Sequence, residues 1–147
     1  MANNLTLEDI NNLYFWATKL EEEEINNISS ENIESKEDIL NLTCITARNS
    51  LPKEVFKLNR LKTLYIEVED LTELPKEIGN LTNLKNLEIK CSNLKELPKE
   101  IWNLSRFEVE FDIKNNNNKE LLKYIVDSPN NENKDVELKI NIKKKED

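Results

Sequence analysis

The sequence predicts an α/β fold in which a short unit, one strand followed by one helical turn, is repeated and stacked into a small solenoid. The tetrapeptide "LPKE" occurs at 51–54, 74–77 and 97–100, and each copy starts 23 residues after the one before. Apolar residues recur at equal offsets between the copies, namely Leu61, Leu64, Ile66 and Leu71, and then Leu84, Leu87, Ile89 and Leu94. One unit cannot bury its own leucines, so the units must stack, and 147 residues suffice for one such domain over 1–147.

Residues 6–36 are expected to form a helical cap at the amino-terminal end of the stack. Thr6 and Asp9 have the spacing of a capping box, which marks the start of a helix. The residues that would share its apolar face are Ile10, Leu13, Tyr14, Ala17 and Leu20. Glu21 to Glu24 follow, and acidic groups are unfavourable at the carboxyl end of a helix, so the helix should fray near them.

The repeats are expected over 37–113, with an irregular first unit. "DILNLTC" would direct Leu40, Leu42 and Cys44 inward, one residue out of register with the later units. Cys44 and Cys91 would then occupy comparable strand-end positions two units apart, with Cα atoms separated by roughly 9 to 10 Å. A disulfide spans at most about 7 Å, so we expect two free thiols, with Cys91 as a small buried hydrophobe.

The most regular unit shows both kinds of periodicity. In "LKNLEIK" the inward residues Leu87 and Ile89 alternate with polar ones, which is typical of a half-buried strand. In "LPKEIGNLTNL" apolar residues recur every three or four positions, at Leu74, Ile78, Leu81 and Leu84. This spacing indicates a short helical turn, and we expect Pro75 at its first position, where a missing N–H has no cost.

The motif "LxxLxIxxxxL", present twice in phase and followed by "LPKEI", resembles the leucine-rich repeat. "LTELPKEIGNLTNLKNLEIKCSN" is similar to the 23-residue version common in bacterial members of that family. The resemblance implies parallel strands on a concave face and helical turns on a convex face. Glu69 and Ser92 stand where the family usually has an internal asparagine, which puts that asparagine ladder in question. A buried unpaired carboxylate would cost on the order of several kcal/mol, so Glu69 is expected to face solvent.

The last unit and the carboxy-terminal cap complete the prediction. "RFEVEFDI" alternates as a strand, and 114–143 should form a cap from the helix "KELLKYIVD" and the strand "DVELKINIK", with a tail at 144–147. Asn115 to Asn118 should form a loop. Trp102 takes the slot of Phe56 and Gly79 in the earlier units. It lies either partly exposed on the convex side or covered by the terminal cap.

The residue types argue against catalysis. The chain contains no histidine, which is the commonest general base, and Gly79 is its sole glycine, so a glycine-rich phosphate loop is excluded. The two cysteines do not have the spacing of a metal or redox site. We therefore expect no catalytic residues, no metal ligands and no cofactor, with an enzyme that uses surface carboxylates as one alternative.

The charge distribution bears on the partner. The net charge is −8, and residues 1–50 hold ten acidic residues against three basic ones, a net of −7. Such a chain is not expected to bind nucleic acid or an anionic membrane directly, because both require clustered Lys and Arg. No signal peptide and no apolar run of about 18 residues is present, so we expect a cytoplasmic monomer whose partner is a protein, with a basic surface as one possibility.

The outward strand positions are the candidate binding residues. They should line adjacent rows about 4.8 Å apart on one concave, acidic sheet surface: Thr63, Tyr65, Glu67, Asn86, Glu88, Lys90, Glu108, Glu110 and Asp112. We predict a non-enzymatic protein–protein interaction module that binds its partner through this face. The alternative is an acidic inhibitor or immunity-like protein that masks a nucleic-acid-binding surface through its amino-terminal third, including Glu21 to Glu24.

Overall fold

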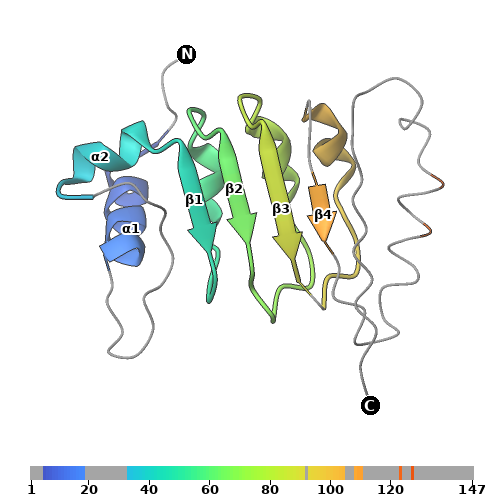
Figure 1. Cartoon of the computed structure of the whole chain (residues 1–147). Coiled ribbons are helices and arrows are strands. Elements are labelled where there is room, and N and C mark those ends of the chain that lie inside the picture. Colours follow the sequence, from blue (N-terminus) through green and yellow to red (C-terminus); the bar gives the residue numbers. More distant parts are fainter. Residues whose placement is uncertain are drawn as a thin grey trace.

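A computed structural model describes residues 5–18, 33–91 and 93–104, the backbone of 108–110, and positions 123 and 127. The described elements are α1 (Leu7–Thr18), α2 (Lys36–Asn41), β1 (Cys44–Ala47), η1 (Lys53–Lys57), β2 (Thr63–Ile66), η2 (Lys76–Asn80), β3 (Asn86–Lys90), η3 (Lys99–Asn103) and β4 (Glu108–Glu110), where η denotes a 3-10 helix. The mixture of helices and strands confirms the α/β class. In Figure 1 the strands lie side by side, the 3-10 helices lie behind them, and α1 and α2 lie next to β1.

The strands form a parallel sheet in the order β1-β2-β3-β4. In the register between β2 and β3, Leu64 is paired with Leu87 and Ile66 with Ile89. Both pairs join residues 23 positions apart, the same interval that separates the "LPKE" segments. On the other side of β2, Leu64 is paired with Ile45 of β1. The 23-residue interval is therefore the step from β2 to β3, whereas paired residues are 19 positions apart between β1 and β2 and 20 between β3 and β4.

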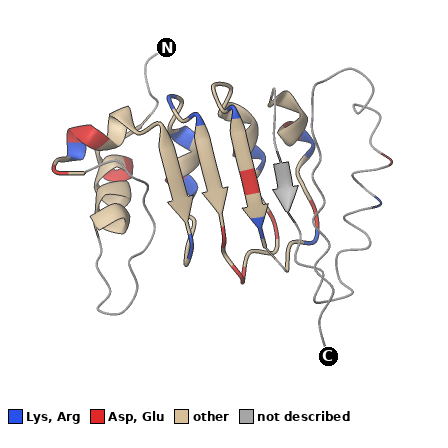
Figure 2. Cartoon of the chain, in the orientation of Figure 1, with Lys and Arg blue, Asp and Glu red and all other residues tan. Residues whose placement is uncertain are grey.

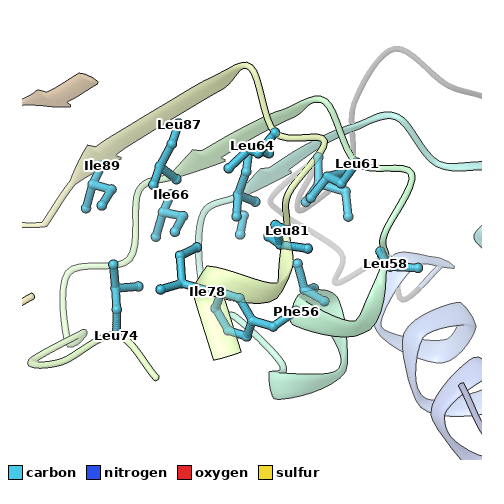
Figure 3. Close-up of a cluster of buried hydrophobic side chains, with 14 of the residues drawn as sticks. Phe56, Leu58, Leu61, Leu64, Ile66, Leu74, Ile78, Leu81, Leu87 and Ile89 are labelled. Carbon is cyan, nitrogen blue, oxygen red and sulfur yellow. The ribbon is translucent and has the colours of Figure 1, made fainter. Parts of the chain in front are cut away.

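The core lies between the sheet and the 3-10 helices. Figure 3 shows Leu64, Ile66, Leu87 and Ile89 on the strands pointing toward Ile78 and other apolar residues. These five side chains are at most 1% exposed. Strand alternation therefore places one face of the sheet entirely in the core and leaves the other face outside it.

Each "LPKE" segment leads into a 3-10 helix, but its proline is not the first helical residue. Pro75 has extended backbone and serves as the N-cap of η2, with its carbonyl accepting a hydrogen bond from the Ile78 N–H at 3.1 Å. Pro52 and Pro98 have the same role for η1 and η3. The prediction that Pro75 begins the turn was wrong by one residue. An N-cap residue also needs no N–H of its own, so proline is acceptable there for the same reason.

The first strand differs from the prediction. Leu40 lies in α2 and Leu42 caps its carboxyl end, so the prediction that Leu40, Leu42 and Cys44 alternate along one strand was wrong. Leu42 does point inward, at 2% exposure, whereas Leu40 and Cys44 are only partly buried. The Ser35 N–H donates to Asp38 Oδ2 at 2.7 Å, which makes "SKED" a capping box and starts a helix. The Ser35 hydroxyl also donates to Asp38 Oδ2, at 2.9 Å. The backbone and side-chain hydrogen bonds from Ser35 together lower the pKa of Asp38. The strand begins only after this helix, and its inward residues are Ile45 and Ala47, both fully buried.

The two cysteines are free, as predicted, but they do not occupy comparable positions. Cys44 begins β1 and is paired with Thr63, whereas Cys91 follows the last residue of β3. They therefore lie at opposite ends of the strands, which corrects the predicted register. Cys91 is fully buried, and this burial raises the pKa of its thiol to about 11. Its role as a small core hydrophobe is confirmed.

Helix α1 begins at the predicted capping box. The Thr6 N–H donates to Asp9 Oδ2 at 2.7 Å, and the Asp9 N–H donates to Thr6 Oγ1 at 3.1 Å. Leu13 on the inner face of the helix is buried. Three polar contacts join α1 to the segment around η1. They are a Lys57 Nζ–Asp9 ion pair at 2.8 Å, a Trp16 Nε1 hydrogen bond to Ser50 Oγ at 2.9 Å and an Asn12 Nδ2 hydrogen bond to Glu54 Oε1 at 3.4 Å. Leu20 and Glu21 to Glu24 lie outside the described residues.

Side-chain amides connect successive segments on the edges of the fold. The Asn83 Nδ2 group donates to the Asn59 carbonyl at 2.7 Å, and the Asn93 Nδ2 group donates to the Glu69 carbonyl at 2.8 Å. Glu69 itself is exposed, as predicted. Ser92 lies outside the described residues. The asparagine that joins neighbouring segments here is therefore Asn93, one position after Ser92, and the sequence pattern did not predict this role.

The slot shared by Phe56, Gly79 and Trp102 is buried in all three helices. Partial exposure of Trp102 is wrong, because the side chain is 4% exposed. Its predicted covering by the terminal cap concerns residues outside the described part of the chain. A Cβ atom on Gly79 would lie 2.8 Å from both the Cβ and the carbonyl oxygen of Glu100. Gly79 therefore permits close approach of η2 and η3. The predicted helix and strand of 114–143 and the loop from Asn115 to Asn118 fall almost wholly outside the described residues, as does the tail.

Candidate functional site

The candidate site lies on the face of the sheet that points away from the 3-10 helices, called here the open face. On β2, Tyr65 stands between the buried Leu64 and Ile66 and therefore points to the opposite side. On β3, Glu88 and Lys90 alternate in the same way with Leu87 and Ile89. The fold thus brings polar side chains from neighbouring strands together on one surface.

The open face is organised in two rows that cross the strands. In the first row, Thr46 of β1 is paired with Tyr65 of β2, and Tyr65 is paired with Glu88 of β3. The second row consists of the residues two positions later in the chain, which are Arg48, Glu67 and Lys90. The Glu67 N–H donates to the Ala47 carbonyl at 2.7 Å, so the parallel pairing continues into the second row. Neighbouring positions within a row are separated by about 4.8 Å.

These two rows enclose a shallow hollow of about 320 Å³. Its lining residues are Thr46, Arg48, Tyr65, Ile66, Glu67, Glu88 and Lys90. The volume is at the low end of the range of roughly 300 to 1,000 Å³ that is usual for ligand sites. Tyr65 is 39% exposed, and the other large apolar or aromatic side chains exposed in the described part of the chain are Leu7 and Phe15 on α1. The hollow therefore combines a central accessible aromatic ring with charged walls.

Charges of both signs meet on this face. Lys90 Nζ lies 2.8 Å from Glu88 Oε1, and Arg48 Nε lies 3.7 Å from Glu67 Oε2. Figure 2 shows acidic and basic segments adjacent on β3. The expected continuous acidic surface was wrong for the described part of this face, because Arg48 and Lys90 balance the two carboxylates. Ion pairs as exposed as these contribute about 0 to 1 kcal/mol, so their members can exchange partners at little cost.

The structure brings together four of the nine predicted residues around the hollow: Tyr65, Glu67, Glu88 and Lys90. Thr63 and Asn86 are paired with each other at the start of β2 and β3 and do not line it. The backbones of Glu108 and Glu110 pair with Glu88 and Lys90, which places them on β4. Asp112 lies outside the described residues. The predicted set is thus divided between the hollow, the strand starts and β4.

Sequence reasoning missed Thr46 and Arg48. Both belong to "CITAR", in which apolar Ile45 and Ala47 alternate with outward residues. The signal was available in the capping box of "SKED". This capping box starts a helix, so the residues just before β1 are helical and do not belong to a strand. With that helix recognised, the first strand would have moved to its correct place, and Arg48 would have appeared beside Glu67.

Two further features of the described residues bear on function. Among them, no group of three or more Asp, Glu or Cys side chains is arranged to hold a metal ion. In the same part of the chain, no helix has the length and apolar character required to cross a membrane.

Comparison with known proteins gives no assignment. No protein-family model matches the sequence, and a search of curated proteins finds no significant match. The functional assignment consequently depends on the geometry of the open face.

Proposed function

We propose that the chain is a short leucine-rich-repeat solenoid that binds another protein through the open face of its sheet. Three observations support the family. The "LPKE" segments recur at a 23-residue interval, residues 23 positions apart are paired in β2 and β3, and each "LPKE" leads into a 3-10 helix behind a parallel strand. Proteins that this sequence resembles bind partners on the corresponding sheet face.

The observation that carries the proposal is the hollow around Tyr65. An aromatic ring that is accessible in the free protein but surrounded by side chains from three neighbouring strands can be fully covered by a partner. Such residues contribute disproportionately to binding, and surrounding polar groups exclude water from the contact. Glu67 and Glu88 form exposed ion pairs, which favours a role in the encounter rate and in orientation over a large contribution to affinity.

A non-enzymatic role agrees with the chemistry of the same surface. The chain has no histidine, and each carboxylate in the hollow already faces a cation. The two free cysteines are typical of a reducing compartment, and we propose the cytoplasm as the location.

The charge distribution favours one second candidate, an acidic inhibitor or immunity-like protein that covers a basic, nucleic-acid-binding surface. The first 50 residues carry ten acidic residues against three basic ones. For that function the contact would be made by the amino-terminal third, including Glu21 to Glu24. The two candidates therefore differ in where the partner binds.

The experiment starts from a partner isolated by affinity capture and then purified. Its dissociation constant is measured by calorimetry at about 50 and 300 mM salt for Glu67→Gln, Glu88→Gln and a Glu21–Glu24 variant reversed to lysine. The control is Glu77→Gln, an exposed residue of η2 behind the sheet that removes the same charge. We expect each open-face variant to weaken binding by a few fold at low salt and by less at high salt. Normal binding by both of them, together with loss of binding in the reversed variant, would favour the acidic mask.

A further inference from the structure

We propose that the hollow on the open face receives an arginine side chain of the partner protein. Its guanidinium would lie against the ring of Tyr65 and bond to the carboxylate of Glu88, with Glu67 completing the negative wall. This inference deepens the proposed function and rests on it, because it names the chemical group that the open face recognises.

Tyr65 is the common neighbour of both carboxylates. It is paired in register with Glu88 of β3, and Glu67 follows it two residues later along the chain. An aromatic ring and two carboxylates therefore surround one corner of the hollow, all three among its lining residues. This combination attracts cations, since the face of the ring is negative and a guanidinium can stack on it while it bonds to a carboxylate.

The protein already places a cation of its own against this corner. Lys90 Nζ lies 2.8 Å from Glu88 Oε1, and its side chain is 45% exposed. An ammonium group acts as a compact point charge, whereas a guanidinium offers planar, bidentate hydrogen bonds and also stacks on an aromatic ring. A partner arginine can consequently replace Lys90 at Glu88 and make contacts that Lys90 cannot make, while Lys90 turns to solvent.

A carboxylate is a poorer occupant. Arg48 and Lys90 extend from β1 and β3, on opposite sides of Glu67, and their positions are separated by about 9 to 10 Å. Each of these cations is already paired with a carboxylate of the protein, Arg48 with Glu67 and Lys90 with Glu88, so a carboxylate ligand between them would meet the like charge of Glu67. The volume of about 320 Å³ suits one large side chain rather than a helix or a strand. The net charge of −8 would also attract a basic partner over a distance.

The test uses amide NMR spectra of the full chain titrated with N-acetyl-arginine amide. The matched control ligand is N-acetyl-citrulline amide, which has nearly the same shape without the charge. We expect saturable shifts at Thr46, Tyr65 and Glu88 for the arginine compound, in the millimolar range, and binding at least about tenfold weaker for citrulline. Glu88→Gln should weaken arginine binding by a similar factor, whereas Glu77→Gln on η2 should leave it unchanged.

Equal binding of arginine and citrulline, or tighter binding of N-acetyl-aspartate amide at the same residues, would overturn the inference. A Tyr65→Ala variant, tested for binding to the purified partner, separates this failure from failure of the proposed function. If the purified partner binds in a Tyr65-dependent way while the arginine compound does not bind, the inference is wrong and the proposed function stands. If the partner binds independently of Tyr65, both are wrong.

Discussion

The two faces of β2 and β3 are built from alternate residues of the same strands, yet they have opposite physical characters. On one face Leu64, Leu87 and their neighbours are at most 1% exposed. On the other, Tyr65, Glu88 and Lys90 surround a hollow that is open to solvent. The core face is restricted to apolar residues of matching size, whereas the open face can vary without loss of the fold. Substitutions on the two faces should therefore separate stability from binding.

The largest effect is expected on the core face. Leu87→Ala removes a fully packed side chain from the middle of the sheet and should leave a cavity that lowers the free energy of unfolding by about 2 to 5 kcal/mol. Chemical denaturation monitored by circular dichroism measures the loss. A loss below about 1 kcal/mol would contradict the placement of Leu87 in the core.

Gly79→Ala extends the comparison to the layer behind the core. The new Cβ atom would approach the backbone oxygen of Glu100 to 2.8 Å, so η2 and η3 must move apart. Overpacking of this kind typically costs about 1 to 3 kcal/mol. Thermal melting of Gly79→Ala should show a clear decrease, and an increase in melting temperature would show that the two helices are less closely packed than the structure indicates.

The Asp9–Lys57 ion pair can be compared with the ion pairs of the open face, because its carboxylate is more buried than theirs. Its hydrogen bond with Lys57, followed by the backbone hydrogen bond from Thr6, lowers the pKa of Asp9 to about 2. Because the folded-state pKa lies below the unfolded value of about 3.9, the stabilisation is fully present above about pH 4 and is lost as the pH falls toward 2. Asp9→Asn should melt at a lower temperature than the wild type at pH 7. The difference should narrow between pH 4 and pH 2, and a difference that stays constant over this range would contradict the assignment.

Glu88→Ala should give the smallest change in stability, within about 0.5 kcal/mol of the wild type, because its ion pair with Lys90 is partly exposed. It is the direct counterpart of Leu87→Ala at the next position of the same strand. Denaturation of both variants under the same conditions checks the alternation. Similar losses for the two would contradict the assignment of one residue to the core and the other to the open face.

The sequence predicted the regular part of the fold well, because there two independent periodicities agree. The 23-residue interval predicted the register of β2 with β3, and the alternation in "LKNLEIK" predicted the two faces of β3. At the amino-terminal end the apolar spacing of "DILNLTC" fits a strand as well as a helix, and only the cap at Ser35 distinguishes them.

The candidate site was predicted less completely than the fold. Alternation identified Tyr65, Glu67, Glu88 and Lys90, but the missed first strand concealed Arg48. The ion pairs that neutralise the face depend on side-chain conformation and on distances across strands, which a linear pattern does not contain. The charge of a surface therefore could not be predicted from the count of acidic residues alone.

The central claim, that a partner binds over Tyr65, is tested most directly by two exposed aromatic residues in different parts of the molecule. Tyr65 stands on the open face, and Phe15 on α1 is 67% exposed. Calorimetry with the purified partner should show that Tyr65→Ala weakens binding by about 2 kcal/mol or more, roughly 30-fold, while Phe15→Ala binds as the wild type does. Both variants should melt close to the wild-type temperature. Normal binding by Tyr65→Ala together with lost binding by Phe15→Ala would contradict the account and move the interface to the amino-terminal helix.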